Sequence, residues 1–324
     1  PKAFPYLAPE MRAALPPVAA MGALLAGASC AAYGPQETAA NVPRPAVRAI
    51  PESSEPSARC ASCHAEATRG WAESMHHASF SNADFQQAYA DEPLPFCRDC
   101  HAPGFRVGRP SAAADGIACL DCHAVPPRHG DAGEHAAART TTVSCSNWHD
   151  FSVANGAHSS LQRTARQHAA SPFAAAPCTS CHDAGDHRFR GTRDLLRANP
   201  VRATFSAAPR ELTVTLRAVG VGHAFPTGDL FRALRVRLWT EGAGGAVTSD
   251  AEIRLRRAFG TSTGHREEEG DTRLGVEPRT WSVPRAPGAV RAHLDVTYER
   301  GASDRGGLFT PFGERPLLSE SWLL

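Results

Sequence analysis

Five short segments of the chain place a histidine four residues after a cysteine. In four of them a second cysteine directly precedes the histidine, and the fifth segment reads Cys145-Ser146-Asn147-Trp148-His149. Thiolates and imidazoles act as nucleophiles and as metal ligands, so these segments are the part of the chain best suited to chemistry. The four complete motifs are Cys60, Cys63 and His64; Cys97, Cys100 and His101; Cys119, Cys122 and His123; and Cys178, Cys181 and His182.

The pattern Cys-x-x-Cys-His is the attachment signature of c-type haem. Two thiols at this spacing reach the two vinyl groups on one edge of the macrocycle, and the adjacent histidine then ligates the iron as the proximal ligand. Structural zinc and thioredoxin-like redox pairs are the alternatives, but neither requires a histidine directly after the second cysteine. The sequence therefore predicts haem c at the four complete motifs.

The segment that lacks its second cysteine stands between two complete motifs, within their range of spacing. Cys145 can still form one thioether and His149 can still ligate iron, with the indole of Trp148 against the edge of the ring. One base separates a cysteine codon from the tryptophan codon, so a sequencing error is one alternative, and an unrelated cysteine is another. We predict five haems, the fifth attached once, with four as the alternative.

Each haem iron has a second axial position. A histidine there gives a low-spin electron-transfer centre, whereas a vacant position allows substrate chemistry. The histidines outside the motifs outnumber the irons, so ligation by two histidines at most irons is expected. Among these histidines, His135 and His158 are second-rank candidates for the distal position.

Four further elements resemble multihaem cytochromes c, a group that loosely includes hydroxylamine oxidoreductase and octahaem tetrathionate reductase. The elements are the W-x-x-S-x-H pattern from Trp71 to His76, "GIACLDCH" (116–123), "CHDAGDHRFRGTRDLL" (181–196) and "GVGHAFPTGDLFRALRVRL" (220–238). The resemblance covers roughly residues 58–300. It implies that His76, His187 and His223 are the distal ligands, and that the last element opens a C-terminal β-domain.

The composition fits a chain with little conventional core. Aromatic residues make up 7%, while the chain has 27 glycines and 26 prolines. The composition and the motifs therefore predict that residues 60–206 form a mostly irregular, short-helical multihaem domain packed around c-type haems. Amphipathic helices are expected at 65–80 and 159–170. With a net charge of +1, nothing in the composition points to nucleic acid as a partner.

Residues 207–324 have a different pattern. Apolar and polar residues alternate in 211–219, 233–239, 251–257 and 290–300, which is the period of half-buried strands, and glycine and proline clusters separate them. These residues predict an antiparallel β-sandwich-like C-terminal domain.

The first part of the chain resembles an export signal. Residues 1–30 include a possible natural start at Met11 and a short apolar run, and they end at Cys30 in a sequence that resembles a lipoprotein box. Residues 31–59, rich in proline, alanine and serine, predict a linker. The mature protein is thus expected in the periplasm or at the cell surface of a bacterium, with a lipid anchor at Cys30 or plain cleavage nearby as the two possibilities.

The sequence favours an exported cytochrome that passes electrons between redox partners, including a quinol-oxidising or outer-membrane electron-transfer complex. The first alternative is an enzyme that acts on a small nitrogen or sulfur compound at a five-coordinate haem; no sequence feature marks such a site. The second is a haem-bearing scaffold subunit of an envelope electron-conduit complex.

Overall fold

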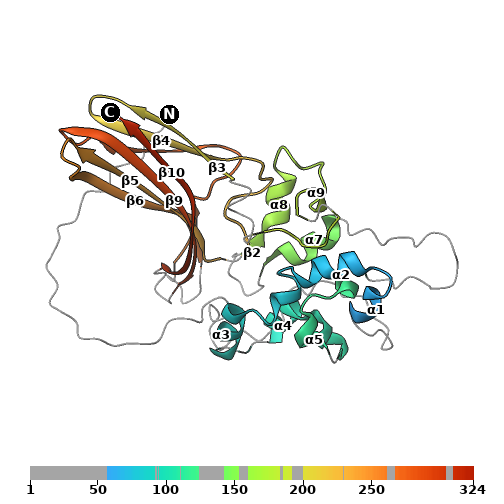
Figure 1. The fold of residues 1–324 in the computed structure, drawn as a ribbon. Helices are drawn as coiled ribbons and strands as arrows, with labels where there is room; N and C mark the ends of the chain where they lie inside the picture. The colour runs from blue at the N-terminus through green and yellow to red at the C-terminus, as the bar shows by residue number, and fades with distance from the viewer. Residues whose placement is uncertain are drawn as a thin grey trace.

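The computed structural model has a region of short helices and a domain of antiparallel sheets (Figure 1). The structure describes residues 57–91, 93, 95–109, 111–123, 142–152, 160–182, 185–191, 200–228, 230–260, 267–303 and 309–324. The expected export signal, nearly all of the linker, Cys30, His135 and His158 lie outside the described residues.

The first region is built from helices of one or two turns. Among the described residues the longest is α3, with nine residues, and no described helix is long and apolar enough to cross a membrane. In chain order the helices and short strands are α1 (Ser57–Ala61), α2 (Ala65–Ala72), η2 (His77–Ser79), α3 (Ala83–Asp91), α4 (Pro95–His101), η3 (Pro103–Val107), α5 (Ala112–Asp115), α6 (Cys119–Cys122), α7 (Thr142–His149), β1 (Asp150–Ser152), β2 (Ser160–Arg163), α8 (Thr164–Ala169) and α9 (Thr179–His182).

Both long helices expected in this region are shorter in the structure. The helix expected at 65–80 ends at Ala72, where the Ser74 hydroxyl accepts a hydrogen bond from the His77 amide at 3.2 Å and competes with the helical ladder. Residues 160–163 form β2, which pairs with β1, so only the second half of the segment 159–170 is helical. Tertiary pairing overrides the local helical pattern in this second segment.

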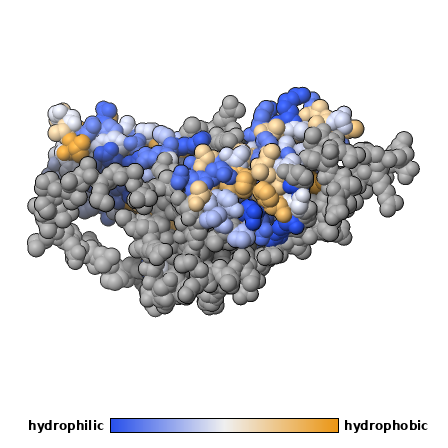
Figure 2. Space-filling model, turned by 90° about the horizontal axis from the view of Figure 1, so that it is seen from below, coloured by the Kyte–Doolittle hydropathy of each residue, from blue (hydrophilic) through white to orange (hydrophobic). Residues whose placement is uncertain are grey.

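Few side chains form a core among the short helices. The apolar cluster there contains buried Phe85 and Cys97, with Phe80 and Tyr89 packed against them. On the face seen in Figure 2, apolar side chains gather over this region, whereas the sheet domain is mostly hydrophilic. A large apolar group among the helices would supply the packing that the side chains do not.

The sheet domain contains two antiparallel sheets that share one core. Their strand orders are β10-β9-β5-β6-β7 and β3-β4-β8, and the core draws on both sheets, including Leu212 and Val214 from one and Leu234, Val236 and Leu294 from the other. The strands are β3 (Val201–Ala207), β4 (Glu211–Ala218), β5 (Arg232–Gly242), β6 (Val247–Gly260), β7 (Glu267–Asp271), β8 (Arg279–Pro284), β9 (Ala289–Ser303) and β10 (Phe309–Leu323). The predicted antiparallel β-domain is confirmed.

The four strands expected from alternation correspond to β4, β5, β6 and β9. The sequence pattern missed β10, which lies at the edge of its sheet and contains Pro311 and Pro316. The register shifts next to both prolines, which is where an edge strand tolerates a residue without an amide donor. The first strand, β3, begins at Val201 and so spans the boundary expected at 206/207.

Contacts join the two regions at several points. The Thr164 hydroxyl lies 2.8 Å from that of Thr227, and Arg300 of β9 pairs with Asp84 of α3 at 2.6 Å. The loop between β4 and β5 thus lies against the helices, and a Cβ added at Gly222 would lie 3.0 Å from Cδ2 of His168. Side chains of this loop can therefore contribute to a site in the helical region.

A close backbone contact in the helical region is made at Gly116, the residue that opens the "GIACLDCH" element. Gly116 has a φ of +57°, and a Cβ there would lie 2.4 Å from the carbonyl oxygen of His77 and 2.6 Å from that of His76. Only glycine allows this approach.

We expect Gly116→Ala to destabilise the protein by about 1–3 kcal/mol through overlap, in addition to the cost of a positive φ. Gly108→Ala is the control for a positive φ without overlap, because Gly108 has a φ of +66° and, among the described residues, nothing lies within 4 Å of an added Cβ. This control is expected to lose only about 1–2 kcal/mol. Urea unfolding of both variants measures the difference, and equal losses would refute the role of the contact.

Candidate haem-binding sites

All five cysteine–histidine segments have the geometry of a single helical turn. His64, His123 and His182 each donate their amide to the carbonyl of the cysteine four residues earlier, at 2.8, 2.8 and 3.1 Å. The other two segments lie within α4 and α7. Residues three and four apart share one face of a helix, so each cysteine and its histidine point the same way. Trp148 occupies in α7 the place that the second cysteine has elsewhere.

The first cysteines of the motifs meet in two pairs. Cys60 is within hydrogen-bonding reach of Cys119, and Cys178 of Cys145. Burial, followed by the neighbouring thiol, raises the pKa of Cys145 to about 11. Motifs that are distant in sequence are therefore adjacent in space, which places their bound groups close together.

The two thiols of the motif in α4 have different surroundings. Cys97 is buried in the apolar cluster with Phe85, whereas Cys100 is only half-buried. The hydrogen bond from Arg106 to Asp99 at 2.7 Å is the main cause of a raised pKa of the Arg106 guanidinium. Cys100 lies close enough to add a smaller contribution in the same direction. A haem bonded to both thiols would thus have one side of its edge against aromatic rings and the other near a cation. Cys97 and Cys100 stay predicted thioether residues.

The second cysteines of the other complete motifs are at least as accessible as Cys100. Cys122 is half-buried, and Cys63 and Cys181 are exposed. These second thiols are therefore reachable from outside the protein core, as attachment of a large group requires.

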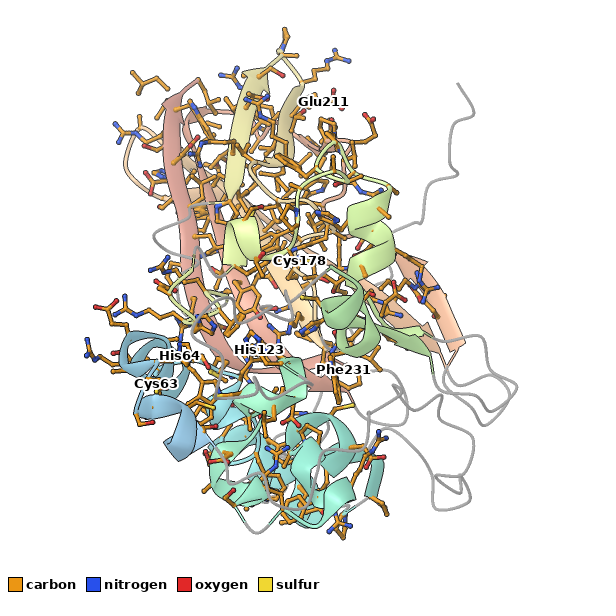
Figure 3. All side chains as sticks on the ribbon, turned by 90° about the vertical axis from the view of Figure 1, so that its right-hand side faces the viewer. Cys63, His64, His123, Cys178, Glu211 and Phe231 are labelled. Atoms are coloured by element: carbon orange, nitrogen blue, oxygen red, sulfur yellow. The ribbon has the colours of Figure 1, made fainter. Side chains whose placement is uncertain are left out.

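The motif histidines differ in position. Cys63 and His64 are exposed at the outer side of the helical region, whereas His123 lies farther in, toward the sheet domain (Figure 3). His101 is half-buried, and its ring stacks on Phe85 with centroids 3.8 Å apart.

Three motif histidines face a second imidazole at nearly the same distance. The ring centroids are 6.1 Å apart in both His123–His187 and His182–His223, and 6.3 Å apart in His76–His149. The planes of each pair are inclined by 24°, 11° and 33°, respectively. The second members are His187, His223 and His76, the histidines that the resemblance implied as distal ligands.

This separation fits a metal ion between two imidazoles. Metal–imidazole bonds are about 2 Å long, so two rings on opposite sides of one metal have centroids on the order of 6 Å apart. Direct packing of two rings needs no such gap. The residues present therefore fit haem iron at three sites, with a cysteine one helical turn from the motif histidine in each.

Oxygen atoms lie next to Nδ1 of several of these histidines. The distances are 2.7 Å from His101 to the Ser79 carbonyl, 2.7 Å from His182 to the Arg190 carbonyl, and 3.0 Å from His149 to Oε1 of Gln162. If Nδ1 carries the proton and donates it, the lone pair of Nε2 is available for a metal. The two complete motifs use a backbone carbonyl for this role, whereas the segment with Trp148 uses a side-chain amide.

The environment keeps three of the facing imidazoles, those of His76, His149 and His223, neutral at neutral pH. Burial lowers the pKa of His76 to about 4, with smaller contributions from His149 and His182. Burial likewise lowers the pKa of His223 to about 4. His149 is open to solvent on one side, yet the protein around it lowers the pKa of its imidazole too. Neutral imidazole is the form that binds metal.

Hydrogen bonds explain why Trp71 and Gly116 accompany His76. The indole nitrogen of Trp71 donates to the carbonyl of Ile117 at 2.8 Å, and the amide of Ile117 donates to the carbonyl of His76 at 3.0 Å. The turn that carries His76 is thereby attached to the segment that leads into α6 and His123.

Sequence reasoning missed two residues beside the imidazoles. Gln162 lies opposite Phe151 in the β1–β2 ladder, and this pairing brings it to His149. Phe189 packs against His76 with ring centroids 4.6 Å apart. The position of Phe189 two residues after His187 in the sequence was a signal for its role. No feature of the sequence predicted the short β1–β2 hairpin, so nothing indicated Gln162.

Comparisons with known proteins agree with this geometry. Residues 59–124 match the family model described as cytochrome c554 and c-prime. A penta-haem cytochrome c552 from Thermochromatium tepidum has a similar structure, with a TM-score of 0.65 and 18% sequence identity, over 83% of this chain and 100% of that chain.

The chain has the fold of a multihaem cytochrome c. The likeness to the penta-haem cytochrome extends over both the short helices and the sheets, since it covers 83% of this chain, which is more than either region alone. The putative ApaA protein of Bordetella pertussis, with 14% identity over 37% of this chain and 89% of its own and a TM-score of 0.20, is too dissimilar to inform on the fold of this chain. No curated protein matches the chain.

Proposed function

We propose that this chain is an exported cytochrome that carries five covalently attached haems c and transfers electrons between redox partners. The three imidazole pairs at 6.1–6.3 Å are the observation that carries the proposal, because two histidines on one iron give a low-spin centre without an open position for substrate. Each haem iron, when bound, accepts and passes on one electron at a time.

In this proposal the protein residues hold and orient the haems. The two cysteines of each complete motif form one thioether each, and His64, His101, His123 and His182 are the proximal ligands. His187 and His223 are distal to His123 and His182, respectively. His135 and His158 stay candidates for the irons at His64 and His101. The proximity of Cys60 to Cys119 supports close haems, which favour rapid electron transfer.

The fifth haem is proposed at the Cys145 site, defined as Cys145, His149 and His76. Its support is the helical turn that α7 shares with the other motifs, and the facing imidazoles of His149 and His76. One thioether from Cys145 is the covalent link, since Trp148 stands in place of the second cysteine.

The finer relationships and the location are also proposals. We infer a relationship to the group that includes hydroxylamine oxidoreductase and octahaem tetrathionate reductase from the ordered elements that carry His76, His187 and His223. We propose the periplasm or the cell surface as the location, with Cys30 as a lipid anchor and a quinol-oxidising or outer-membrane electron-transfer complex as the partner.

The purified holoprotein tests this function by its haem count and its spin state. A pyridine haemochrome assay is expected to give five haems per chain, and electron paramagnetic resonance (EPR) of the oxidised protein is expected to show low-spin signals from the three paired sites. A high-spin signal together with turnover of nitrite or hydroxylamine would contradict an electron carrier and indicate an enzyme.

A further inference from the structure

One short segment, residues 185–191, contacts imidazoles from three of the proposed iron sites. These imidazoles are His187, which belongs to the segment, and His76 and His182, which do not. The contact with His182 is made by the main chain: the amide of Arg190 donates to the carbonyl of His182, and the carbonyl of Arg190 lies 2.7 Å from its Nδ1. The contacts with the other two imidazoles meet at one side chain.

That side chain is Phe189. Its ring centroid lies 4.6 Å from that of His76, with the planes inclined by 54°, and 5.8 Å from that of His187, with the planes inclined by 77°. Tilted and edge-to-face packing restricts how each neighbouring ring can rotate. One phenyl ring therefore lies against two imidazoles that face different partners.

The backbone that presents Phe189 is strained. The φ angles of His187 and Phe189 are +57° and +45°, in the region that residues with a Cβ rarely adopt. Such a conformation persists only where the surroundings fix it, and strain of this kind is concentrated at functional positions.

Contacts on both sides fix this backbone. Asp186 pairs with Arg190, and Arg188 pairs with Glu73 at the end of α2 at 2.9 Å. A Cβ added at Gly70 would lie 1.6 Å from the carbonyl oxygen of Asp186, so the segment lies directly on α2. The close approach of Asp186 to Gly70 therefore places the segment that carries Phe189 against α2.

We propose that Phe189 is a positioning residue that fixes the orientations of the axial imidazoles of His76 and His187, and thereby links the electronic properties of two haems. The proposal rests on the function proposed above, because it takes both imidazoles as iron ligands. The orientation of an axial imidazole affects the electronic structure and reduction potential of its haem. The ring of Phe189 thus orients one axial imidazole at each of two haems. In the His182–His223 pair, by contrast, the main-chain carbonyl of Arg190 orients the imidazole of His182.

The test compares EPR spectra and redox titrations of the holoprotein and its Phe189→Ala variant. The haem count is expected to stay unchanged, since no ligand or thioether is removed. Two low-spin signals are expected to shift or broaden, with shifts in two midpoint potentials, and the signal of the His182–His223 site is expected to stay the same. Phe189→Tyr keeps the ring and is expected to retain the original spectrum.

Two further variants make the outcome decisive. Phe205→Ala removes a phenyl ring that stacks on Trp322 in the sheet domain, with centroids 4.4 Å apart, and is expected to leave all haem signals unchanged. Phe189→Leu keeps most of the apolar volume if the alanine variant folds poorly, and it is expected to move the same two signals by less.

Unchanged spectra in both the alanine and leucine variants at full haem count, or equal shifts at all haems, would overturn the proposal. A wild-type protein without low-spin haem at the Cys145 site would instead count against the proposed function.

Discussion

Replacement of Cys145 by alanine is expected to remove one haem from the covalently attached set and leave four. Trp148 leaves the Cys145 site a single thiol, so its loss leaves only the iron–histidine bonds of His149 and His76 to hold that haem. Acid denaturation protonates both imidazoles and breaks those bonds. Mass spectrometry of the denatured variant should therefore show a mass lower than that of the wild type by one haem.

Cys178→Ala is the matched control, because Cys178 is the neighbouring thiol of Cys145 and belongs to a complete motif. Cys181 remains for a thioether, so this variant is expected to keep all of its haems through denaturation. Trp148→Cys restores the second thiol and should shift the haemochrome absorption band of one haem to that of a haem with two thioethers. Four covalent haems in the wild-type protein would contradict the prediction.

Replacement of His76 by alanine is expected to abolish one low-spin signal. Its imidazole is the one that faces His149 at 6.3 Å, and alanine offers no ligand at that position. The iron would become five-coordinate or bind water, and a high-spin signal should appear in its place. EPR and visible spectra of the oxidised protein measure both changes, while the denatured mass should remain that of five haems.

The control for this prediction is the adjacent residue. His77 packs against Trp71 with ring centroids 4.3 Å apart, and its buried Nδ1 has no hydrogen-bond partner within the part of the chain that the structure describes. His77→Ala is expected to keep every low-spin signal, with at most a loss of stability from the lost packing. A high-spin signal in the His77 variant but not in the His76 variant would reverse the assignment.

The sequence predicted those parts of the molecule that follow local rules. The Cys-x-x-Cys-His motifs require a fixed spacing, and the sequences of β4, β5, β6 and β9 alternate apolar with polar residues over much of their length because their apolar residues pack into the core. β10 escaped prediction because its prolines conflict with strand propensity, and only its edge position makes them acceptable. β2 was not predicted because it forms through pairing with β1, which the local sequence pattern does not indicate.

In the candidate haem sites too, the sequence predicted what local motifs determine and missed what tertiary contacts determine. The resemblance implied His76, His187 and His223 as distal ligands, but it could not say which motif histidine each would face. That depends on contacts such as Ile117 with His76, which join segments far apart in the sequence. Gln162 and Phe189 depend on such contacts as well. Their residue types carry no metal signal.

The pairing of distant histidines has a consequence for how the chain is held together. In the proposed function the cysteines of the motifs form thioethers to haem, so they would not be available for disulfides. With iron bound, each facing pair closes a loop between remote segments, and the His182–His223 pair ties the sheet domain to the helices. In a chain-entropy view, cross-linking loops of this length restricts the unfolded state by about 4 kcal/mol each. The iron–histidine bonds would thus be the cross-links between remote segments of a protein whose helices are short.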